Sequence, residues 1–93
     1  MRQVKDAVTH RATARFWQCY ELMPEEIRAT ADRNFALLKA NPRHPSLRFK
    51  KLGRFWSARV GGAHRALALE DDEGFIWVWI GSHDEYEETI RRR

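Results

Sequence analysis

The chain has 93 residues, of which 43% are hydrophobic and 12% are aromatic, and this content argues against a disordered tail. We expect one small folded domain over residues 1–93. The net charge of +4 indicates an anionic partner. The single cysteine excludes an intrachain disulfide and favours a reducing, cytoplasmic setting. No apolar run approaches the ~20 residues that a membrane span requires, so we expect no membrane association.

The first half of the chain predicts two helices. Residues Met1–His10 alternate weakly and predict either a short edge strand or a frayed end. Apolar residues then recur at helical spacing from Thr13, which suits an N-cap. Pro24 ends this helix and opens the next, whose apolar stripe stops at Asn41-Pro42. We therefore expect two antiparallel helices joined by a very short turn. The stripe of the second helix consists of Ile27, Ala31, Phe35 and Leu38.

In the second half of the chain the hydrophobic period changes from 3.6 residues to 2. This alternation predicts strands at Phe55–Val60, Ala63–Glu70 and Phe75–Ile80, and the short turns between them indicate an antiparallel meander. Ser82 followed by Glu85 matches a capping box and predicts a short C-terminal helix. The expected fold is therefore α+β, with an N-terminal helical hairpin packed on an antiparallel β-sheet meander and a short C-terminal helix.

A long basic segment overlaps the predicted sheet. It contains Arg43, Arg48, Lys50, Lys51, Arg54, Arg59 and Arg65. No acidic residue occurs between Arg43 and Leu69. A basic sheet of this kind suits a polyanion whose backbone is bound and cut, and the alternative is a surface that only binds an acidic partner.

The turn between the first two strands decides whether Arg59 and Arg65 share a face of the sheet. A tight two-residue turn at Gly61-Gly62 would place Arg59 opposite His64 and would direct Arg65 to the other face. A three-residue turn that also includes Ala63 places both arginines on one face, and glycines tolerate the positive φ that such a turn uses. We favour the three-residue turn, and the tight turn stays open as the alternative because it also collects an apolar face.

Four short segments follow the helical hairpin in a recognisable order. They are Asn41–Leu52, Trp56–Val60, His64–Leu67 and Ile80–Tyr86. In order and spacing, the hairpin and these segments resemble the RelE/ParE superfamily of type II toxin–antitoxin toxins over about residues 13–90. The resemblance implies a RelE-like microbial RNase fold that a cognate antitoxin neutralises. It also implies two activities, because RelE-type members cut messenger RNA in the ribosomal A site whereas the ParE branch poisons DNA gyrase.

The resemblance also implies which residues form a site. RelE-like toxins place alternating basic residues on the first strand of the meander; Arg59 fits one of them, whereas Ser57 occupies the place of the other. Arg65 matches the arginine at the start of the following strand. His83, after Gly-Ser, resembles the catalytic histidine of the YafQ-like branch, and Tyr86 corresponds to the aromatic residue that follows the last strand.

These residues suit RNA cleavage without a metal ion, in which the ribose 2′-hydroxyl attacks the adjacent phosphate. His83 is the acid–base candidate because an imidazole titrates near neutral pH. Arg59 and Arg65 are the candidates for stabilising the charge that develops on the phosphate. Tyr86 is a candidate for stacking on a base or for assisting proton transfer. The structural alternatives are a histidine that only packs or hydrogen-bonds at a helix start, exposed arginines, and a tyrosine packed beneath a helix.

Four further cations are the candidates for binding the RNA backbone: Arg48, Lys50, Lys51 and Arg54. The remaining histidines show no ligand spacing, so we expect neither a metal site nor a cofactor. The expected function is that of a toxin that cuts mRNA on the ribosome, with the ribosome, mRNA and a cognate antitoxin as partners. A ParE-like inhibitor of DNA gyrase and an inactive homologue that only binds an antitoxin are the alternatives.

Overall fold

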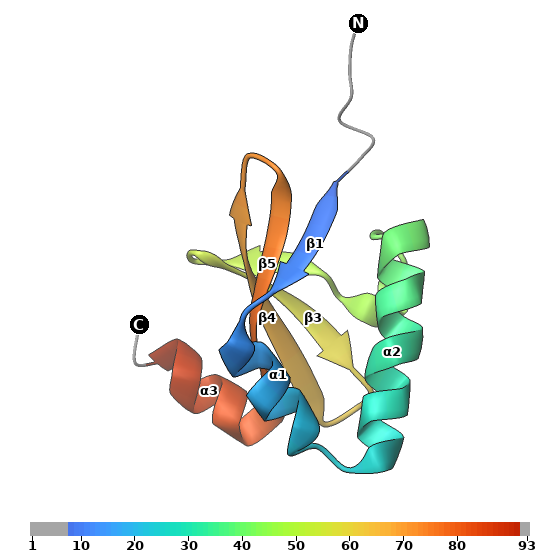
Figure 1. Cartoon of the computed structure of the whole chain (residues 1–93), viewed down its shortest axis with the longest axis vertical. Helices are drawn as coiled ribbons and strands as arrows, with labels where there is room; N and C mark the ends of the chain where they lie inside the picture. The colour runs from blue at the N-terminus through green and yellow to red at the C-terminus, as the bar shows by residue number, and fades with distance from the viewer. Residues whose placement is uncertain (1–7, 92–93) are drawn as a thin grey trace, which may run out of the picture.

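The computed structural model describes residues 8–91. The elements are β1 (Thr9–Ala12), α1 (Ala14–Glu21), α2 (Glu25–Ala40), the 3-10 helix η1 (Pro45–Leu47), β2 (Lys50–Leu52), β3 (Phe55–Val60), β4 (His64–Asp71), β5 (Gly74–Ser82) and α3 (His83–Arg91). The strands form one mixed sheet in the order β1-β5-β4-β3-β2, and helices flank it (Figure 1). In this described part of the chain, no helix combines the length and apolarity that crossing a membrane requires.

The two N-terminal helices begin and end close to the predicted residues. The Thr13 side-chain oxygen caps α1 by accepting from the main-chain N–H three residues later, at 3.1 Å. Pro24 stands at the N-cap of α2, one residue before the first helical position, and α2 ends at Ala40. The Tyr20 hydroxyl of α1 donates to the Asp32 carboxylate of α2 at 2.8 Å, which ties the hairpin together. The predicted helical hairpin is confirmed.

The predicted meander is also confirmed, as β3, β4 and β5, but the sheet has two more strands. β1 pairs with β5 in parallel, with Thr9 opposite Gly74, and so forms an edge strand. The rest of the segment predicted as an edge strand or frayed end, residues 1–7, lies outside the described residues. β2 pairs with β3 in antiparallel fashion and places Lys50 opposite Ser57. With three residues, β2 is too short for an alternating pattern to reveal it.

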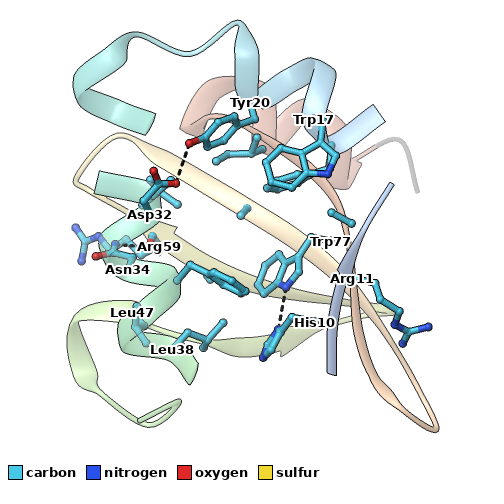
Figure 2. A pocket seen from close by; sticks show the side chains of 18 residues that line it. His10, Arg11, Trp17, Tyr20, Asp32, Asn34, Leu38, Leu47, Arg59 and Trp77 are labelled. Carbon is cyan, nitrogen blue, oxygen red and sulfur yellow. Dashed lines mark hydrogen bonds between the residues drawn. The ribbon is translucent and has the colours of Figure 1, made fainter. Parts of the chain in front are cut away.

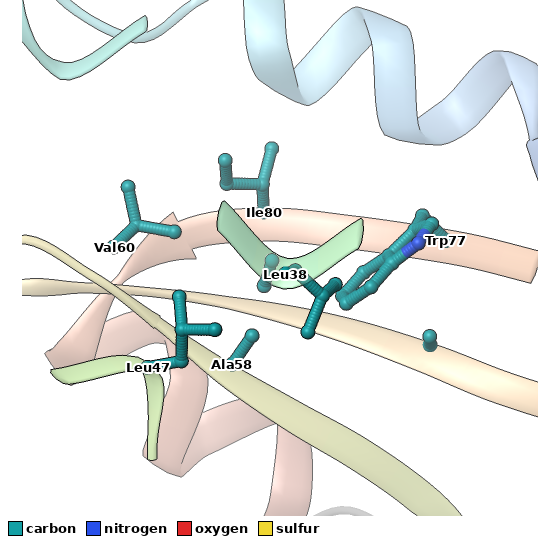
Figure 3. Close-up of a cluster of buried hydrophobic side chains, with 8 residues drawn as sticks. Leu38, Leu47, Ala58, Val60, Trp77 and Ile80 are labelled. Atoms are coloured by element: carbon teal, nitrogen blue, oxygen red, sulfur yellow. The ribbon is translucent and has the colours of Figure 1, made fainter. Parts of the chain in front are cut away.

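The main core lies between one face of the sheet and the helical hairpin (Figure 3). Its buried residues are Leu38, Leu47, Ala58, Val60, Ala66, Ala68, Trp77 and Ile80. The three alanines belong to β3 and β4, and their small side chains let Leu38 of α2 approach the sheet closely. The pairing of Val60 with His64 places all three alanines on this face.

A second core lies on the opposite face of the sheet. It consists of Phe55, Leu67, Trp79 and Tyr86. Neighbouring residues of a strand point to opposite faces, so Leu67 cannot share a face with the alanines on either side of it. Because Tyr86 belongs to α3, the two faces of the sheet are covered by different helices, α2 on one and α3 on the other. The described elements therefore form a three-layer arrangement around one sheet.

His10 joins β1 to β5 on the hairpin side of the sheet. Its Nδ1 accepts a hydrogen bond from the indole N–H of Trp77 at 3.1 Å, and its ring stacks on Phe75 and meets the edge of Phe35. Burial and, to a smaller extent, the charge of Lys39 lower the pKa of His10 below its ordinary value of 6.5. An indole N–H only donates, so the accepting nitrogen of His10 must be unprotonated in the folded state.

This geometry predicts acid destabilisation through His10. The unfolded chain takes up a proton at the ordinary pKa of 6.5, whereas the folded chain resists it. Stability should therefore be complete above pH 6.5 and fall as the pH drops toward the lowered pKa. His10→Asn keeps an acceptor for Trp77 but does not titrate, so its urea midpoint should depend less on pH over this range. Equal pH slopes for the parent and His10→Asn would show that His10 is not responsible.

Candidate active site

The turn between β3 and β4 brings two arginines together. Val60 pairs with His64, so the turn consists of the three residues 61–63, and Arg59 lies directly opposite Arg65. Gly61 adopts a positive φ of 65°, as the three-residue turn requires. The favoured turn is therefore confirmed, and the tight two-residue alternative is wrong. Arg59 and Arg65 share the face of the sheet that α3 covers.

The start of α3 places His83 beside this turn. The main-chain N–H of His83 donates to the carbonyl oxygen of Ala63 at 2.7 Å. Ser82 and Glu85 form the predicted capping box, each side chain accepting from the other residue's main-chain N–H at 3.2 Å. Gly81 makes this cap possible, because a Cβ there would lie 2.8 Å from a carboxylate oxygen of Glu85. His83 is thus fixed to the sheet through its main chain and through the helix cap.

Tyr86 connects His83 to Arg65. The guanidinium carbon of Arg65 lies 5.8 Å from the centre of the Tyr86 ring, within cation–π range. The Tyr86 and His83 rings are stacked, with centres 5.7 Å apart and an interplanar angle of 27°. Tyr86 is only 9% exposed, so its ring holds its neighbours in place and is not open to a base. Of the readings that the sequence left open for Tyr86, packing is the one this geometry favours.

Arg59, Arg65, Tyr86 and His83 therefore form one group, which we call the basic cluster. The Arg59 Nε–H donates to the Gly61 carbonyl oxygen at 3.2 Å, and an Arg65 Nη1–H donates to the His64 carbonyl oxygen at 3.3 Å. Among the described residues, the ion pairs include neither arginine. Each guanidinium consequently keeps N–H groups and its full charge for an anionic ligand.

His83 is the accessible member of the pair that it forms with Tyr86. Its side chain is 43% exposed, and its Nε2 lies 3.3 Å from a carboxylate oxygen of Glu87, one helical turn later. Glu87 also approaches Arg91 at 3.7 Å, so its charge is shared between two cations. A half-exposed imidazole can exchange a proton with a bound ligand, and the guanidinium groups of the two arginines can bind an oxyanion.

The four predicted backbone-binding cations are not equivalent. Lys50, opposite Ser57, lies on the face of the basic cluster, whereas Lys51, opposite Trp56, lies on the other face. Arg54 lies in the turn between β2 and β3, with its guanidinium over the Phe55 ring at 5.7 Å. It is five residues along β3 from Arg59, roughly 17 Å at the rise of a strand. Arg48 follows η1 in a left-handed conformation with φ of 45°. The structure thus brings only Lys50 beside the cluster through strand pairing.

A separate apolar cavity lies on the hairpin side of the sheet, and the sequence did not predict it (Figure 2). Its volume is about 220 Å³, and its walls come from α1, α2 and the sheet. The polar groups at its edge are mutually paired: Tyr20 with Asp32, Trp77 with His10, and the Asn34 amide with the main-chain oxygen of Arg59 at 3.1 Å. Arg59 of the basic cluster also lines this cavity, whereas Arg65, Tyr86 and His83 do not. Within residues 8–91, no group of three or more His, Cys, Asp or Glu side chains is placed to hold a metal ion.

Comparison with known proteins shows a shared fold without a sequence match. No protein-family model and no curated protein sequence matches the chain significantly. The structure is similar to YafQ from E. coli strain BL21(DE3), with a TM-score of 0.69 and 13% identity over 84% of this chain and 96% of that chain. It is also similar to the RelBE2 toxin–antitoxin complex from Mycobacterium tuberculosis, with a TM-score of 0.64 and 25% identity over 83% and 92%.

A third similar structure is a YoeB/ParE toxin from Agrobacterium tumefaciens, with a TM-score of 0.63 and 16% identity over 80% of this chain and 96% of that chain. The α+β fold of this chain is therefore the fold of toxins from toxin–antitoxin systems. YafQ, the YoeB/ParE toxin and the RelBE2 complex share it, so the fold that the resemblance to RelE/ParE toxins implies is confirmed.

Proposed function

We propose that this chain is the toxin of a type II toxin–antitoxin system and that it cuts messenger RNA on the ribosome, in the cytoplasm, without a metal ion. The observation that carries the proposal is the basic cluster, in which His83 and Arg65 both contact the ring of the buried Tyr86 and Arg59 pairs with Arg65 across two strands. The cluster combines an acid–base group with two cations, which are the functions that 2′-hydroxyl attack requires.

In the proposed reaction the ribose 2′-oxygen attacks the adjacent phosphorus, and the bond to the 5′-oxygen of the next nucleotide breaks. The products are a cyclic phosphate and a free 5′-hydroxyl. Arg59 and Arg65 bind the non-bridging oxygens and stabilise the charge that develops on them. The 2′-hydroxyl loses a proton and the leaving 5′-oxygen gains one; His83 transfers the proton at one of these oxygens, and solvent water does so at the other. Tyr86 is a positioning residue, because its buried ring contacts both Arg65 and His83 without being open to the RNA.

The proposed protein partner is a cognate antitoxin. One of the structures similar to that of this chain, RelBE2, is a complex of a toxin with its antitoxin. The unpaired guanidinium groups of the cluster and the exposed lysines of β2 would attract an acidic segment of such a partner, and a disordered segment would fold as it binds. Binding there would compete directly with RNA for the same charges.

A ParE-like inhibitor of DNA gyrase is the second candidate. Ser57 favours it, since this small buried residue stands where RelE-like toxins carry a second basic residue on the same strand. The similarity to a structure described as a YoeB/ParE toxin is compatible with either activity. An inactive homologue that only binds an antitoxin would share the fold with both.

Mapping of RNA ends separates these candidates. Brief induction of the parent chain in a bacterial host should produce new mRNA 5′ ends that carry a hydroxyl group and fall within translated regions. Purified gyrase should supercoil DNA normally in the presence of the same chain. The opposite pattern, with inhibited supercoiling and intact messages, would establish the ParE-like activity instead. Intact messages and active gyrase together would indicate an inactive homologue.

A further inference from the structure

The alternation of strand residues divides the exposed lysines of β2 between the two faces of the sheet. Lys50 and Lys51 are adjacent in sequence and are both exposed. Their strand partners differ, since Lys50 pairs with Ser57 and Lys51 with Trp56. Ser57 belongs to the face of the basic cluster, whereas Trp56 packs against the hairpin-side core. One lysine therefore lies on the face of the cluster and its neighbour does not.

Lys50 lies one strand beyond the arginine pair. Arg65 of β4 pairs with Arg59 of β3, and Lys50 of β2 is the diagonal neighbour of Arg59, because Ser57 stands two residues before it. Diagonal neighbours of this kind are about 7–8 Å apart, within reach of a long side chain. The three cations thus follow a line across β4, β3 and β2.

The residue between Lys50 and the arginines supports this arrangement. Ser57 is 3% exposed and its short side chain projects little from the sheet. A larger side chain there would separate the ammonium group of Lys50 from the arginines. Among the described residues, the ion pairs do not include Lys50, so its charge is available.

We propose that Lys50 binds a phosphate of single-stranded RNA next to the phosphate held by Arg59 and Arg65, and that the RNA backbone crosses the sheet from β4 toward β2. This inference rests on the proposed RNase function, because it takes RNA as the ligand of the basic cluster. Lys50 provides from the neighbouring strand the charge that Ser57 does not provide on β3. A backbone contact of this kind adds affinity without sequence preference.

Binding measurements on uncleavable RNA test the proposal. The probe is a single-stranded RNA oligonucleotide with 2′-O-methyl riboses, which cannot undergo 2′-hydroxyl attack. Lys50→Ala should weaken binding about tenfold, the usual effect of losing a charged hydrogen bond. It should also reduce the steepness of the log–log salt dependence by about 0.7, the contribution of one phosphate contact on a single strand. Lys50→Arg, which keeps the charge, should bind nearly as tightly as the parent.

Two other variants act as controls. Lys51→Ala removes the same charge from the next residue, and it should weaken binding less than Lys50→Ala because its side chain starts on the other face. Lys39→Ala removes an exposed lysine of α2 whose ammonium group lies over the Phe35 ring, and binding should stay at the parental value. Both variants carry the same net charge as Lys50→Ala, so the comparison separates position from charge.

The proposal is overturned if Lys50→Ala binds as the parent does, if Lys51→Ala loses as much affinity, or if the parent binds no RNA. Cleavage of message by the parent, measured separately, distinguishes this failure from failure of the proposed function. A parent that cuts message while the two lysine variants bind alike refutes only the role of Lys50. A parent that cuts nothing while the variants differ refutes the RNase function and retains the binding site.

Discussion

His83→Ala should reduce mRNA cleavage by about 10²–10⁴-fold, the usual contribution of a general acid–base group. His83 is the histidine of the basic cluster, and its imidazole is the cluster's most accessible ring. The fold should persist, because the residue is half-exposed at the start of α3 and its side chain makes an i,i+4 pair with Glu87 and a ring contact with Tyr86, neither of them in the interior of the protein. Such a pair contributes about 0.2–0.5 kcal/mol. The measurement is cleavage of a defined message on programmed ribosomes, accompanied by a thermal melt.

The control for this variant is another histidine. His44 lies in the loop before η1, and its Nδ1 accepts from the main-chain N–H of Ser46 at 3.2 Å. His44→Ala should therefore leave the cleavage rate near that of the parent. If His83→Ala cuts as fast as the parent, His83 is not the acid–base group. If instead both histidine variants lose activity equally, the loss reflects a general effect on the protein and not the chemistry at position 83.

Leu67→Ala should lower the free energy of unfolding by about 2–5 kcal/mol. Leu67 is fully buried, and it lies on β4 between Ser57 of β3 and Trp79 of β5, where it forms the floor on which Tyr86 packs. A domain of this size typically has only about 5–15 kcal/mol of stability in total, so this one substitution should shift the urea midpoint strongly.

Leu22→Ala is the matched control for Leu67→Ala. Leu22 is 81% exposed after α1, so removal of the same atoms should change the stability by less than about 0.5 kcal/mol. Cleavage by Leu67→Ala, measured well below its melting temperature, should also decline, since α3 carries Tyr86 and His83 and loses part of its packing surface. Equal stabilities of the two leucine variants would contradict the assignment of Leu67 to the second core.

The sequence predicts those parts of the fold whose signals are local. Thr13, Pro24 and the Ser82–Glu85 capping box define helix ends within a few residues, and β3 matches its predicted range. β1 was not identified as a parallel partner of β5, because its four residues carry little alternation and pair with residues more than sixty positions later. Pairing over such a separation is determined by the packed sheet and not by local pattern.

The candidate site also has a part that local sequence predicts and a part that depends on how distant segments pack. The sequence favoured a three-residue turn, with Arg59 and Arg65 on one face, but left the two-residue turn open, and one additional turn residue reverses every following side chain. The contact of Arg65 with the Tyr86 ring could not be predicted in this way, because it depends on the angle at which α3 packs against the sheet. The residues of the second core determine that angle. To predict that Lys50 and Lys51 lie on different faces of the sheet, one must know the register of β2. This strand is too short to be recognised from its sequence.

The direct junction of β5 and α3 has a consequence for how the site can vary. Ser82 ends the strand and His83 begins the helix, with no residue between them. The end of the strand therefore fixes the rotation of α3 about its own axis. Each residue of a helix corresponds to about 100° of this rotation. One residue added at this junction would rotate His83 away from Arg65 while leaving both elements intact. A substitution near the junction changes one side chain of the site and leaves the others in place. An insertion or deletion at the junction instead moves His83 out of the site.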